Sequence, residues 1–192
     1  MPDPSAYCVL LVDDEPAIRD VLSSELKEAG FEAQEARDGI DALVKLRATL
    51  PDVIIPDLQM PRMSGEEFIV VVRRRFPQIP VIIFSGLSQG GLPAEAKPDG
   101  FFEKGALQMP GLLKAVRDLV RKTADRPYVP QVISTPVRTH RGGAGYFVLT
   151  CTDCLRLFQV MSTPEIKTVE RTATCVYCEA SVPFLVECAE SE

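Results

Sequence analysis

Short apolar segments alternate with longer amphipathic ones over residues 7–124. This alternation is typical of a parallel sheet with helices packed on its faces. Parallel strands that are covered on both faces tend to be apolar throughout, and the first of the segments fits that pattern. The predicted strands are Cys8–Val12, Phe31–Ala36, Asp52–Ile55, Val81–Phe84 and Gly100–Glu103.

The segments between these strands have apolar residues at helical spacing, which predicts helices. Pro16 suits a first helical turn and Gly30 a helix end, so the first helix is expected between them. The next helix follows Asp38-Gly39, the third spans Glu66–Phe76, and the last has a buried stripe of Leu112, Val116, Leu119 and Val120. The segment 88–93 contains two glycines and a proline, so the fourth helix is expected to be short or mobile. The fold class is α/β, with a doubly wound five-stranded parallel sheet.

The periodic pattern stops after residue 123, where prolines and the glycine-rich stretch 142–145 predict an extended linker. A second, small β-rich module is expected beyond it. Its predicted strands are Tyr146–Thr150, Val169–Thr174 and Ser181–Cys188. The predicted organisation is a first domain over 1–124, a linker over 125–145 and the module over 146–192.

Length and charge narrow the class of protein. A chain of 192 residues fits one medium domain with a small appendage, and its apolar and charged fractions of 46% and 25% are ordinary for globular proteins. The net charge is −6, with 15 basic and 19 acidic residues up to residue 124, and 6 and 8 after it. Nucleic acid is therefore not expected to be the principal partner. The sequence has no membrane-spanning run and no secretion signal at its start, so a cytoplasmic location is expected.

Acidic residues follow two of the predicted strands. Asp13 and Asp14 come after the first strand and Asp57 after the third, and neighbouring strand ends would bring them together. Such carboxylates repel each other unless a cation lies among them, and Mg²⁺ is the expected ion. Ser85 and Lys104, after the fourth and fifth strands, would suit a transferred phosphoryl group.

These residues form motifs that resemble the response regulator receiver family of two-component systems. The motifs, in family order over residues 7–124, are Leu11-Val12-Asp13-Asp14-Glu15, Asp57-Leu58-Gln59-Met60-Pro61 with Ser64-Gly65, Phe84-Ser85-Gly86 and Glu103-Lys104-Gly105.

The resemblance implies a flavodoxin-like receiver whose phosphoacceptor is Asp57. It also implies that Asp13, Asp14, Asp57 and the main-chain carbonyl of Gln59 hold Mg²⁺. Lys104 and Ser85 would contact the phosphoryl group, and Ser85 with Phe101 would form the switch. The implied partner is a sensor histidine kinase or a phosphotransfer protein, and the chain is expected not to be an enzyme beyond its own phosphotransfer and dephosphorylation.

Two residues depart from the family pattern. Pro56 directly precedes the acceptor and removes a hydrogen bond from a central strand, and Gly105 replaces the usual proline after the lysine. A pseudo-receiver that is not phosphorylated and acts as a scaffold is therefore an alternative.

Four of the six cysteines form two pairs near the end of the chain. Cys151 and Cys154, and Cys175 and Cys178, have two residues within each pair and twenty between pairs, which fits a tetrahedral zinc site. The arrangement is similar to zinc ribbons, and a closed four-thiolate site is structural. A redox-active dithiol and an iron–sulfur or rubredoxin-type iron site are alternatives with the same ligands.

The remaining candidates fit ordinary roles. Cys8 and Cys188 are interpreted as strand residues, and His140 as part of a solvated stretch of the linker. The leading hypothesis is a response regulator whose phosphorylation switches protein–protein interactions of the receiver or the zinc module, with an unknown downstream protein. DNA binding through the zinc module is the alternative output.

Overall fold

The computed structural model describes residues 7–86, 92, 96–105, 108–123, 137–139, 146–161 and 170–186. The chain divides into two compact units, residues 1–130 and 131–192. Apart from Leu92, the predicted interrupted helix at 88–93 lies outside the described residues. Within the described ranges, no helix is long and apolar enough to cross a membrane.

The first unit contains the predicted parallel sheet. Its strands are β1 (Cys8–Val12), β2 (Glu32–Ala36), β3 (Val53–Pro56), β4 (Ile82–Ser85) and β5 (Gly100–Glu103). β1 pairs with β2 on one side and with β3 on the other, and β4 pairs with β5, all in parallel. A parallel bridge between Ile54 and Val81 joins the two parts. The strand order β2-β1-β3-β4-β5 is that of a flavodoxin-like doubly wound sheet, which confirms the predicted fold class.

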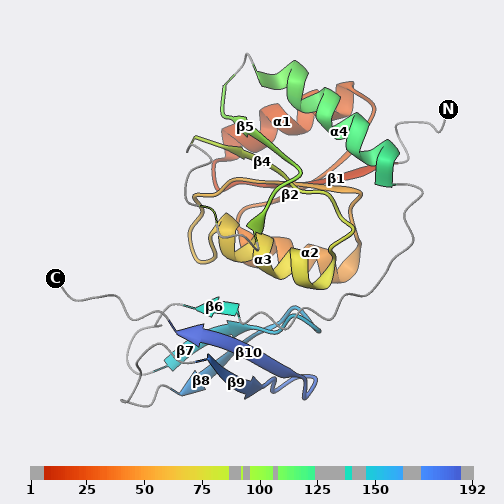
Figure 1. Cartoon of the computed structure of the whole chain (residues 1–192). Helices are drawn as coiled ribbons and strands as arrows, with labels where there is room; N and C mark the ends of the chain where they lie inside the picture. Colours follow the sequence, from red (N-terminus) through yellow and green to blue (C-terminus); the bar gives the residue numbers. More distant parts are fainter. Residues whose placement is uncertain are drawn as a thin grey trace. The chain divides into compact units, whose positions relative to one another are not determined.

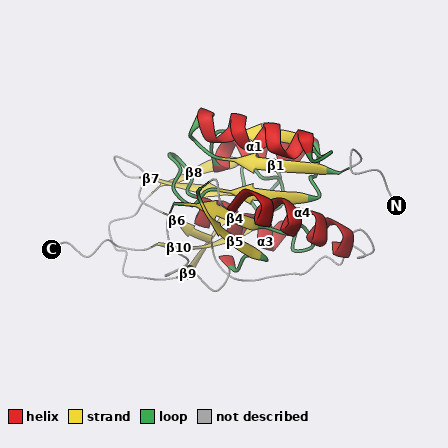
Figure 2. Ribbon diagram, turned by 90° about the horizontal axis from the view of Figure 1, so that it is seen from above, coloured by secondary structure: helices red, strands yellow, loops and turns green. Residues whose placement is uncertain are grey.

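Helices cover both faces of this sheet. They are α1 (Pro16–Glu28), α2 (Gly39–Ala48), α3 (Gly65–Arg75) and α4 (Met109–Thr123). Helices α1 and α4 lie on one face and α2 and α3 on the other (Figure 1). Seen from above, α1 and α4 lie along the strands that they cover (Figure 2).

Two cores form because successive side chains of a strand point to opposite faces of the sheet. Val9 and Leu11 of β1 pack toward α1 and α4, in a cluster with Leu22, Leu26, Leu112, Val116 and Val120. Leu10 and Val12 therefore point to the face that α2 and α3 cover, and both are fully buried. Burial on both faces explains why β1 is apolar throughout.

Pro56 explains why the sheet is discontinuous between β3 and β4. The N–H of Asp57 donates to Val12 O of β1 at 2.8 Å, whereas the N–H of Ile54 donates to Pro80 O at 3.0 Å. Since N–H groups alternate in direction along a strand, the nitrogen of Pro56 faces β4 and has no proton to donate. Pairing of β3 with β4 is consequently limited to the bridge at Ile54.

The described part of the second unit forms two hairpins and one added strand. Its strands are β6 (Val137–Thr139), β7 (Tyr146–Thr150), β8 (Leu157–Met161), β9 (Glu170–Thr174) and β10 (Ser181–Val186). β7 pairs with β8 and β9 with β10, both antiparallel, and β6 pairs with β10 in parallel. Of the predicted linker, 125–145, only the residues of β6 are described, and neither β6 nor β8 was expected from the sequence.

Within the described residues, the core cluster of this unit is small. It contains Phe147, Leu149, Phe158, Val182 and Phe184, with two cysteines, Cys151 and Cys175, among them. The rings of Phe147 and Phe184 lie 6.3 Å apart and join the two hairpins.

Candidate functional site

The ends of β1 and β3 place two buried aspartates side by side. Val12 and Pro56 are partners in the register of these strands, so the next residues, Asp13 and Asp57, lie next to each other. The N–H of Asp13 donates to Ala36 O of β2 at 3.0 Å, which fixes the end of β1 from its other side. Asp13 is 3% exposed and Asp57 4%.

Asp14 completes an acidic cluster at this edge of the sheet. One carboxylate oxygen from each of Asp13, Asp14 and Asp57 lies within 4.8 Å of the others, and Asp14 is exposed to solvent. Two buried carboxylates in such a cluster need a cation to offset their charge, and hard oxygen ligands are those that Mg²⁺ prefers. The residues present therefore fit a Mg²⁺ site open to water on the Asp14 side.

Lys104 and Ser85 converge on the carboxylate of Asp57. The N–H of Lys104 donates to Ser85 O at 2.9 Å, so the ends of β4 and β5 are held together at the site. Lys104 Nζ lies 2.7 Å from Asp57 Oδ2, and Ser85 Oγ donates to Asp57 Oδ1 at 2.5 Å. Asp57 Oδ1 also accepts the N–H of Leu58 at 2.6 Å and that of Gln59 at 3.3 Å.

Lys104 is shared among three carboxylates. Its Nζ lies 3.0 Å from Asp13 Oδ2 and 3.0 Å from Glu15 Oε1, in addition to its contact with Asp57. Burial lowers the pKa of Lys104, but its hydrogen bonds to Asp57, Asp13 and Glu15 outweigh burial and raise that pKa above its ordinary value. The ammonium therefore stays charged at any physiological pH.

Burial also raises the pKa of the Asp13 carboxyl, although the N–H of Glu15 and the ammonium of Lys104 act in the opposite direction. The nearby charge of Asp57 adds to the rise. A raised pKa means that the ionised form of Asp13 is disfavoured in the folded protein, and a bound cation would stabilise that form.

The loop between β3 and α3 is held close to Asp57. Ser64 caps α3: its hydroxyl accepts the N–H of Glu67, whose carboxylate accepts the N–H of Ser64. Gly65 N donates to Leu58 O at 2.9 Å. A Cβ at Gly65 would lie 2.0 Å from Asp57 O, so only glycine permits this approach. The Ser64-Gly65 motif is thus a structural requirement of the site.

A second set of contacts ties the same loop to the start of α2. Arg62, which has a positive φ of 67°, forms an ion pair with the buried carboxylate of Asp38. Asp38 also accepts the N–H of Asp41 at 2.9 Å and so caps α2. The side chain of Met63 packs on Gly39, and a Cβ at Gly39 would lie 2.6 Å from that side chain. Sequence reasoning missed this pair, since nothing in the local spacing links Arg62 to Asp38.

The predicted switch residues lie on neighbouring strands. Phe101 of β5 is paired with Ile83, two residues before Ser85, and its side chain is half-buried. Ser85 is fully buried, with its hydroxyl already turned toward Asp57.

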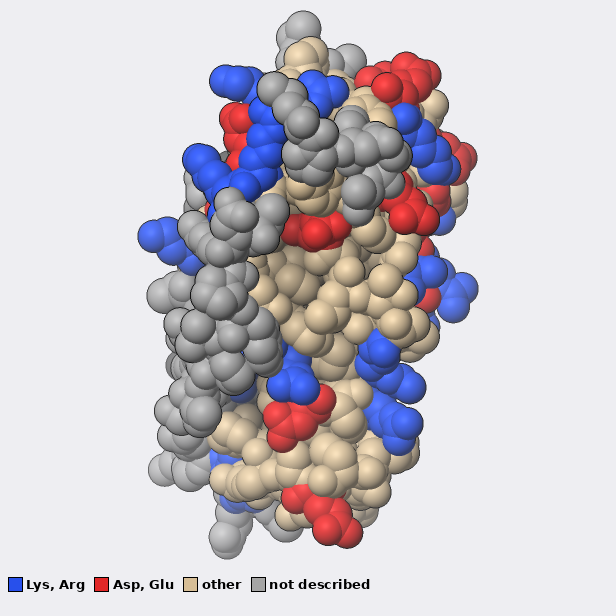
Figure 3. Space-filling view, turned by 90° about the vertical axis from the view of Figure 1, so that its right-hand side faces the viewer, with Lys and Arg blue, Asp and Glu red and all other residues tan. Residues whose placement is uncertain are grey.

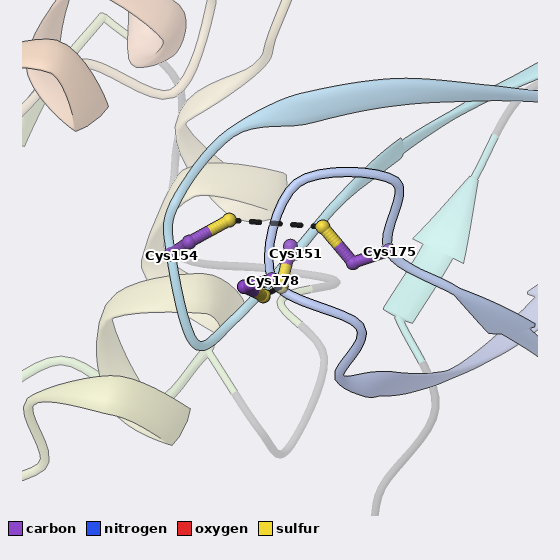
Figure 4. A group of neighbouring side chains, drawn as sticks. All are labelled: Cys151, Cys154, Cys175 and Cys178. Atoms are coloured by element: carbon purple, nitrogen blue, oxygen red, sulfur yellow. Dashed lines mark hydrogen bonds between the residues drawn. The ribbon is translucent and has the colours of Figure 1, made fainter.

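The four paired cysteines lie at the turns of the two hairpins. One Sγ from each of Cys151, Cys154, Cys175 and Cys178 lies within 4.8 Å of the others. Figure 4 shows Cys154 and Cys175 pointing toward each other and Cys151 lying beside Cys178; the Sγ–Sγ distances are 3.7 Å and 3.6 Å. A tetrahedral zinc site with Zn–S bonds of about 2.3 Å has edges of about 3.8 Å. The sulfur geometry therefore fits such an ion.

The two hairpin turns have the same hydrogen-bond pattern. In the first turn, the N–H of Cys151 donates to Arg156 O at 3.0 Å and that of Leu155 donates to Cys151 O at 2.8 Å. In the second turn, the N–H of Cys175 donates to Ala180 O at 2.9 Å and that of Glu179 donates to Cys175 O at 3.0 Å. Leu155 and Glu179 both have left-handed backbone conformations, with φ of 56° and 61°. Zinc-ribbon turns often have glycine at this position, and here two non-glycine residues adopt the conformation that glycine favours.

Burial raises the pKa of the Cys151 thiol to about 12. Burial also raises that of Cys175, but the N–H groups of Tyr177 and Cys178 outweigh it and lower the pKa of Cys175 to about 7. These N–H groups therefore favour a thiolate at Cys175, the form that binds a metal.

Among the remaining candidates, only Cys8 is described, and it is not part of either cluster. Cys8 is half-buried in β1, where burial and the charges of Glu32 and Asp52 raise its thiol pKa to about 11. The raised pKa favours the protonated thiol, which is the less reactive form. Cys188 and His140 lie outside the described residues.

Comparison with solved structures identifies relatives of the first unit. The response regulator TrrA from Thermotoga maritima, in complex with Mg(2+)-BeF, is 31% identical with a TM-score of 0.55; the match covers 59% of this chain and 98% of that chain. The receiver domain of a signal transduction histidine kinase from Syntrophus aciditrophicus is 26% identical, with a TM-score of 0.58, and covers 66% and 99%.

Curated proteins with diverse outputs also match. The transcriptional activator protein ExaE of Pseudomonas putida is 35% identical over 144 residues, 71% of this chain and 65% of that protein. The protein-glutamate methylesterase/protein-glutamine glutaminase of Pyrococcus horikoshii is 41% identical over 95 residues, 46% of this chain and 24% of that protein. This chain thus spans less than two thirds of the length of either relative.

The family model of the response regulator receiver domain matches residues 9–104, which is half of the chain. This range begins in β1 and ends at Lys104, so it contains every residue of the acidic site. The chain belongs to the response regulator receiver domain family.

Proposed function

We propose that this protein is a response regulator whose acceptor, Asp57, is phosphorylated by a sensor histidine kinase or a phosphotransfer protein. The observation that carries the proposal is the convergence of Lys104 Nζ and Ser85 Oγ on the two oxygens of the buried Asp57 carboxylate, at 2.7 Å and 2.5 Å. Receiver domains work with such phosphodonors, and the family match includes all three residues.

In the proposed reaction, an oxygen of Asp57 attacks the phosphorus atom of a phosphohistidine. The O–P bond forms while the P–N bond breaks, and the electron pair leaves with the imidazole nitrogen of the donor. Lys104 and Ser85 then donate to oxygens of the transferred phosphoryl group. Mg²⁺ bound by Asp13, Asp14, Asp57 and the Gln59 carbonyl would offset the charge of the phosphoryl oxygens.

Phosphorylation would change the surface near Ser85 and Phe101. The hydroxyl of Ser85 now donates to Asp57 Oδ1, and a phosphoryl group would offer it a new acceptor farther out. Phe101 is half-buried on the adjacent strand and can follow this movement. This pair would convert a local charge change into a change of the interaction surface.

The output that we favour is a protein–protein interaction with an unidentified downstream partner. ExaE is a transcriptional activator, which supports DNA binding as a second candidate. The described ranges of the second unit, however, include only three basic residues, Arg138, Arg156 and Arg171. On the face shown in Figure 3, basic and acidic groups are interspersed. A protein partner therefore fits better than a DNA backbone.

We further propose that the four-cysteine cluster holds a structural zinc ion. The Sγ distances and the matching turns support a closed tetrahedral site, which leaves no position for a substrate.

The proposed domain boundaries are 1–124 for the receiver domain, 125–145 for the linker and 146–192 for the four-cysteine module. We propose that the chain has no catalytic activity beyond its own phosphotransfer and dephosphorylation, although one relative is a methylesterase, and that it acts in the cytoplasm.

The test is phosphorylation of the full chain by acetyl phosphate, followed by intact mass spectrometry. We expect a single Mg²⁺-dependent phosphoryl adduct on the wild type and none on Asp57→Ala or Asp57→Asn. Asp118 is an exposed residue of α4, so Asp118→Asn is the matched control and should be phosphorylated like the wild type. A folded wild type without an adduct would instead support a pseudo-receiver scaffold. Metal analysis of the same sample tests for one zinc per chain.

A further inference from the structure

Glu15 occupies the N-cap position of α1 without capping the helix. Short side chains such as Ser, Thr, Asp and Asn are preferred there because their oxygen accepts an N–H of the first turn. Glu15 makes no such hydrogen bond. Its carboxylate instead reaches the phosphoacceptor site, where Oε1 lies 3.0 Å from Lys104 Nζ. The side chain thus serves the site rather than the helix.

All three donors of the Lys104 ammonium can be assigned to carboxylates. Besides Glu15, they face Asp13 Oδ2 at 3.0 Å and Asp57 Oδ2 at 2.7 Å. A phosphoryl oxygen that Lys104 contacts must therefore replace one of these acceptors. The side chain of Glu15 is 60% exposed, whereas those of Asp13 and Asp57 are 4% and 5% exposed. Glu15 is the partner that water can solvate, so it is the one that Lys104 can release most readily.

We propose that Glu15 is a positioning residue that restrains Lys104 and slows phosphorylation of Asp57. The inference rests on the proposed function of Asp57 as acceptor. Two effects act in the same direction. The ion pair between Glu15 and Lys104 must loosen before Lys104 turns to the phosphoryl group, and the carboxylate adds negative charge where an anionic donor approaches.

The charge of Glu15 should affect a cation and an anion in opposite ways. The same carboxylate that repels a phosphodonor attracts Mg²⁺ to Asp13, Asp14 and Asp57. Glu15→Gln is therefore expected to speed phosphorylation by acetyl phosphate about two- to fivefold at saturating Mg²⁺ and low salt, the range of exposed ion pairs. The same variant should bind Mg²⁺ about two- to threefold more weakly, as measured by calorimetry. A residue with a merely structural role would lower both quantities when it is replaced.

Two further variants separate the ion pair from other effects. Glu28→Gln makes the same charge change at the exposed C-terminal end of α1, and it should leave both quantities unchanged. Glu15→Asp keeps the charge but shortens the side chain, so it should speed phosphorylation while Mg²⁺ affinity stays near that of the wild type. A rate equal to that of the wild type for Glu15→Asp would overturn the role of the ion pair.

The result that overturns the inference as a whole is a wild type that forms the adduct and a Glu15→Gln variant that forms it at the same rate or more slowly. A wild type that forms no adduct would overturn the proposed function, and the inference with it. The two failures are therefore distinguishable in one experiment.

Discussion

At the scale of single residues, Gly65 shows how a backbone contact limits the sequence of the site. A Cβ there would lie 2.0 Å from Asp57 O and 2.8 Å from Leu58 Cα. Both atoms belong to the backbone, so no side-chain rotation relieves the clash. Gly65→Ala is expected to destabilise the receiver by about 1–3 kcal/mol and to slow phosphorylation, because the start of α3 must move away from the acceptor.

Gly105→Ala is the matched control, since nothing lies within 4 Å of a Cβ built at Gly105. Urea denaturation of both variants, followed by circular dichroism, measures the difference. Equal stabilities would contradict a close contact between the start of α3 and the backbone of Asp57.

Leu155 and Glu179 occupy equivalent turn positions but should respond differently to glycine. A left-handed conformation costs L-residues about 1–2 kcal/mol, and glycine avoids that cost while losing more backbone entropy on folding. Glu179 is exposed, so Glu179→Gly should stabilise the zinc-loaded second unit by up to about 1 kcal/mol. Leu155 is 4% exposed, and Leu155→Gly should destabilise it because buried apolar surface is lost.

Denaturant unfolding with zinc in excess measures both variants. Opposite signs are the expected result. A loss of stability in Glu179→Gly would show that the left-handed conformation of this turn is not strained.

The positions of residues at the carboxyl ends of the predicted strands were sufficient to predict which reactive side chains lie together. Asp13, Asp57 and Lys104 each follow a strand directly and Ser85 is the last residue of β4, and parallel strands bring such residues to one edge. The contact of Glu15 with Lys104 and that of Arg62 with Asp38 were not predictable in this way. They join residues 89 and 24 positions apart through long side chains, and their partners depend on the geometry of loops rather than on strand order.

At the scale of elements, Pro56 affects the pairing of strands more than it affects the acceptor. Its missing N–H faces β4, whereas the N–H of Asp57 still donates to Val12 O at 2.8 Å. Pro56→Val should therefore change the phosphorylation rate by less than about twofold, while the new amide of residue 56 becomes protected by bonding to β4. Hydrogen exchange reports the protection and acetyl phosphate kinetics the rate. A much faster reaction in the variant would assign Pro56 a direct effect on the site.

The predicted elements differ in how completely their sequence pattern specifies them. The apolar residues of β1 and β3 are buried on both faces, so a continuous run was a sufficient signal. In β8, Phe158 is buried while Gln159 is exposed. Because this strand has five residues and four of them are apolar, the alternation of apolar and polar residues is too weak to predict it. The strand β6 has three residues and exists through its pairing with β10, a contact that no local pattern encodes.

At the scale of the whole molecule, the two units differ in how they are stabilised. The first buries apolar side chains on both faces of a sheet, whereas the core cluster in the described part of the second has seven buried residues, of which two are cysteines. A unit of this size rarely folds on apolar burial alone. The metal, if bound as proposed, would supply the stability that the core lacks.

Removal of the metal should therefore unfold one unit and spare the other. A zinc-selective chelator with Mg²⁺ kept in excess, or the substitution Cys154→Ala, is expected to abolish the β-sheet signal and amide dispersion of the second unit in NMR spectra. Signals from β1 to α4 should persist, and phosphorylation at Asp57 should proceed at the rate of the untreated chain, because none of the acidic-site ligands is a cysteine. Cys8→Ala is the matched control, since Cys8 lies in β1 and outside the four-cysteine cluster.

If the phosphorylation rate fell when the second unit unfolded, the two units would have to be coupled energetically, and the zinc-binding unit would influence the reaction of the receiver. If instead the second unit stayed folded without metal, its stability would have to come from the Phe147–Phe184 core, and the four thiols would be free for redox chemistry.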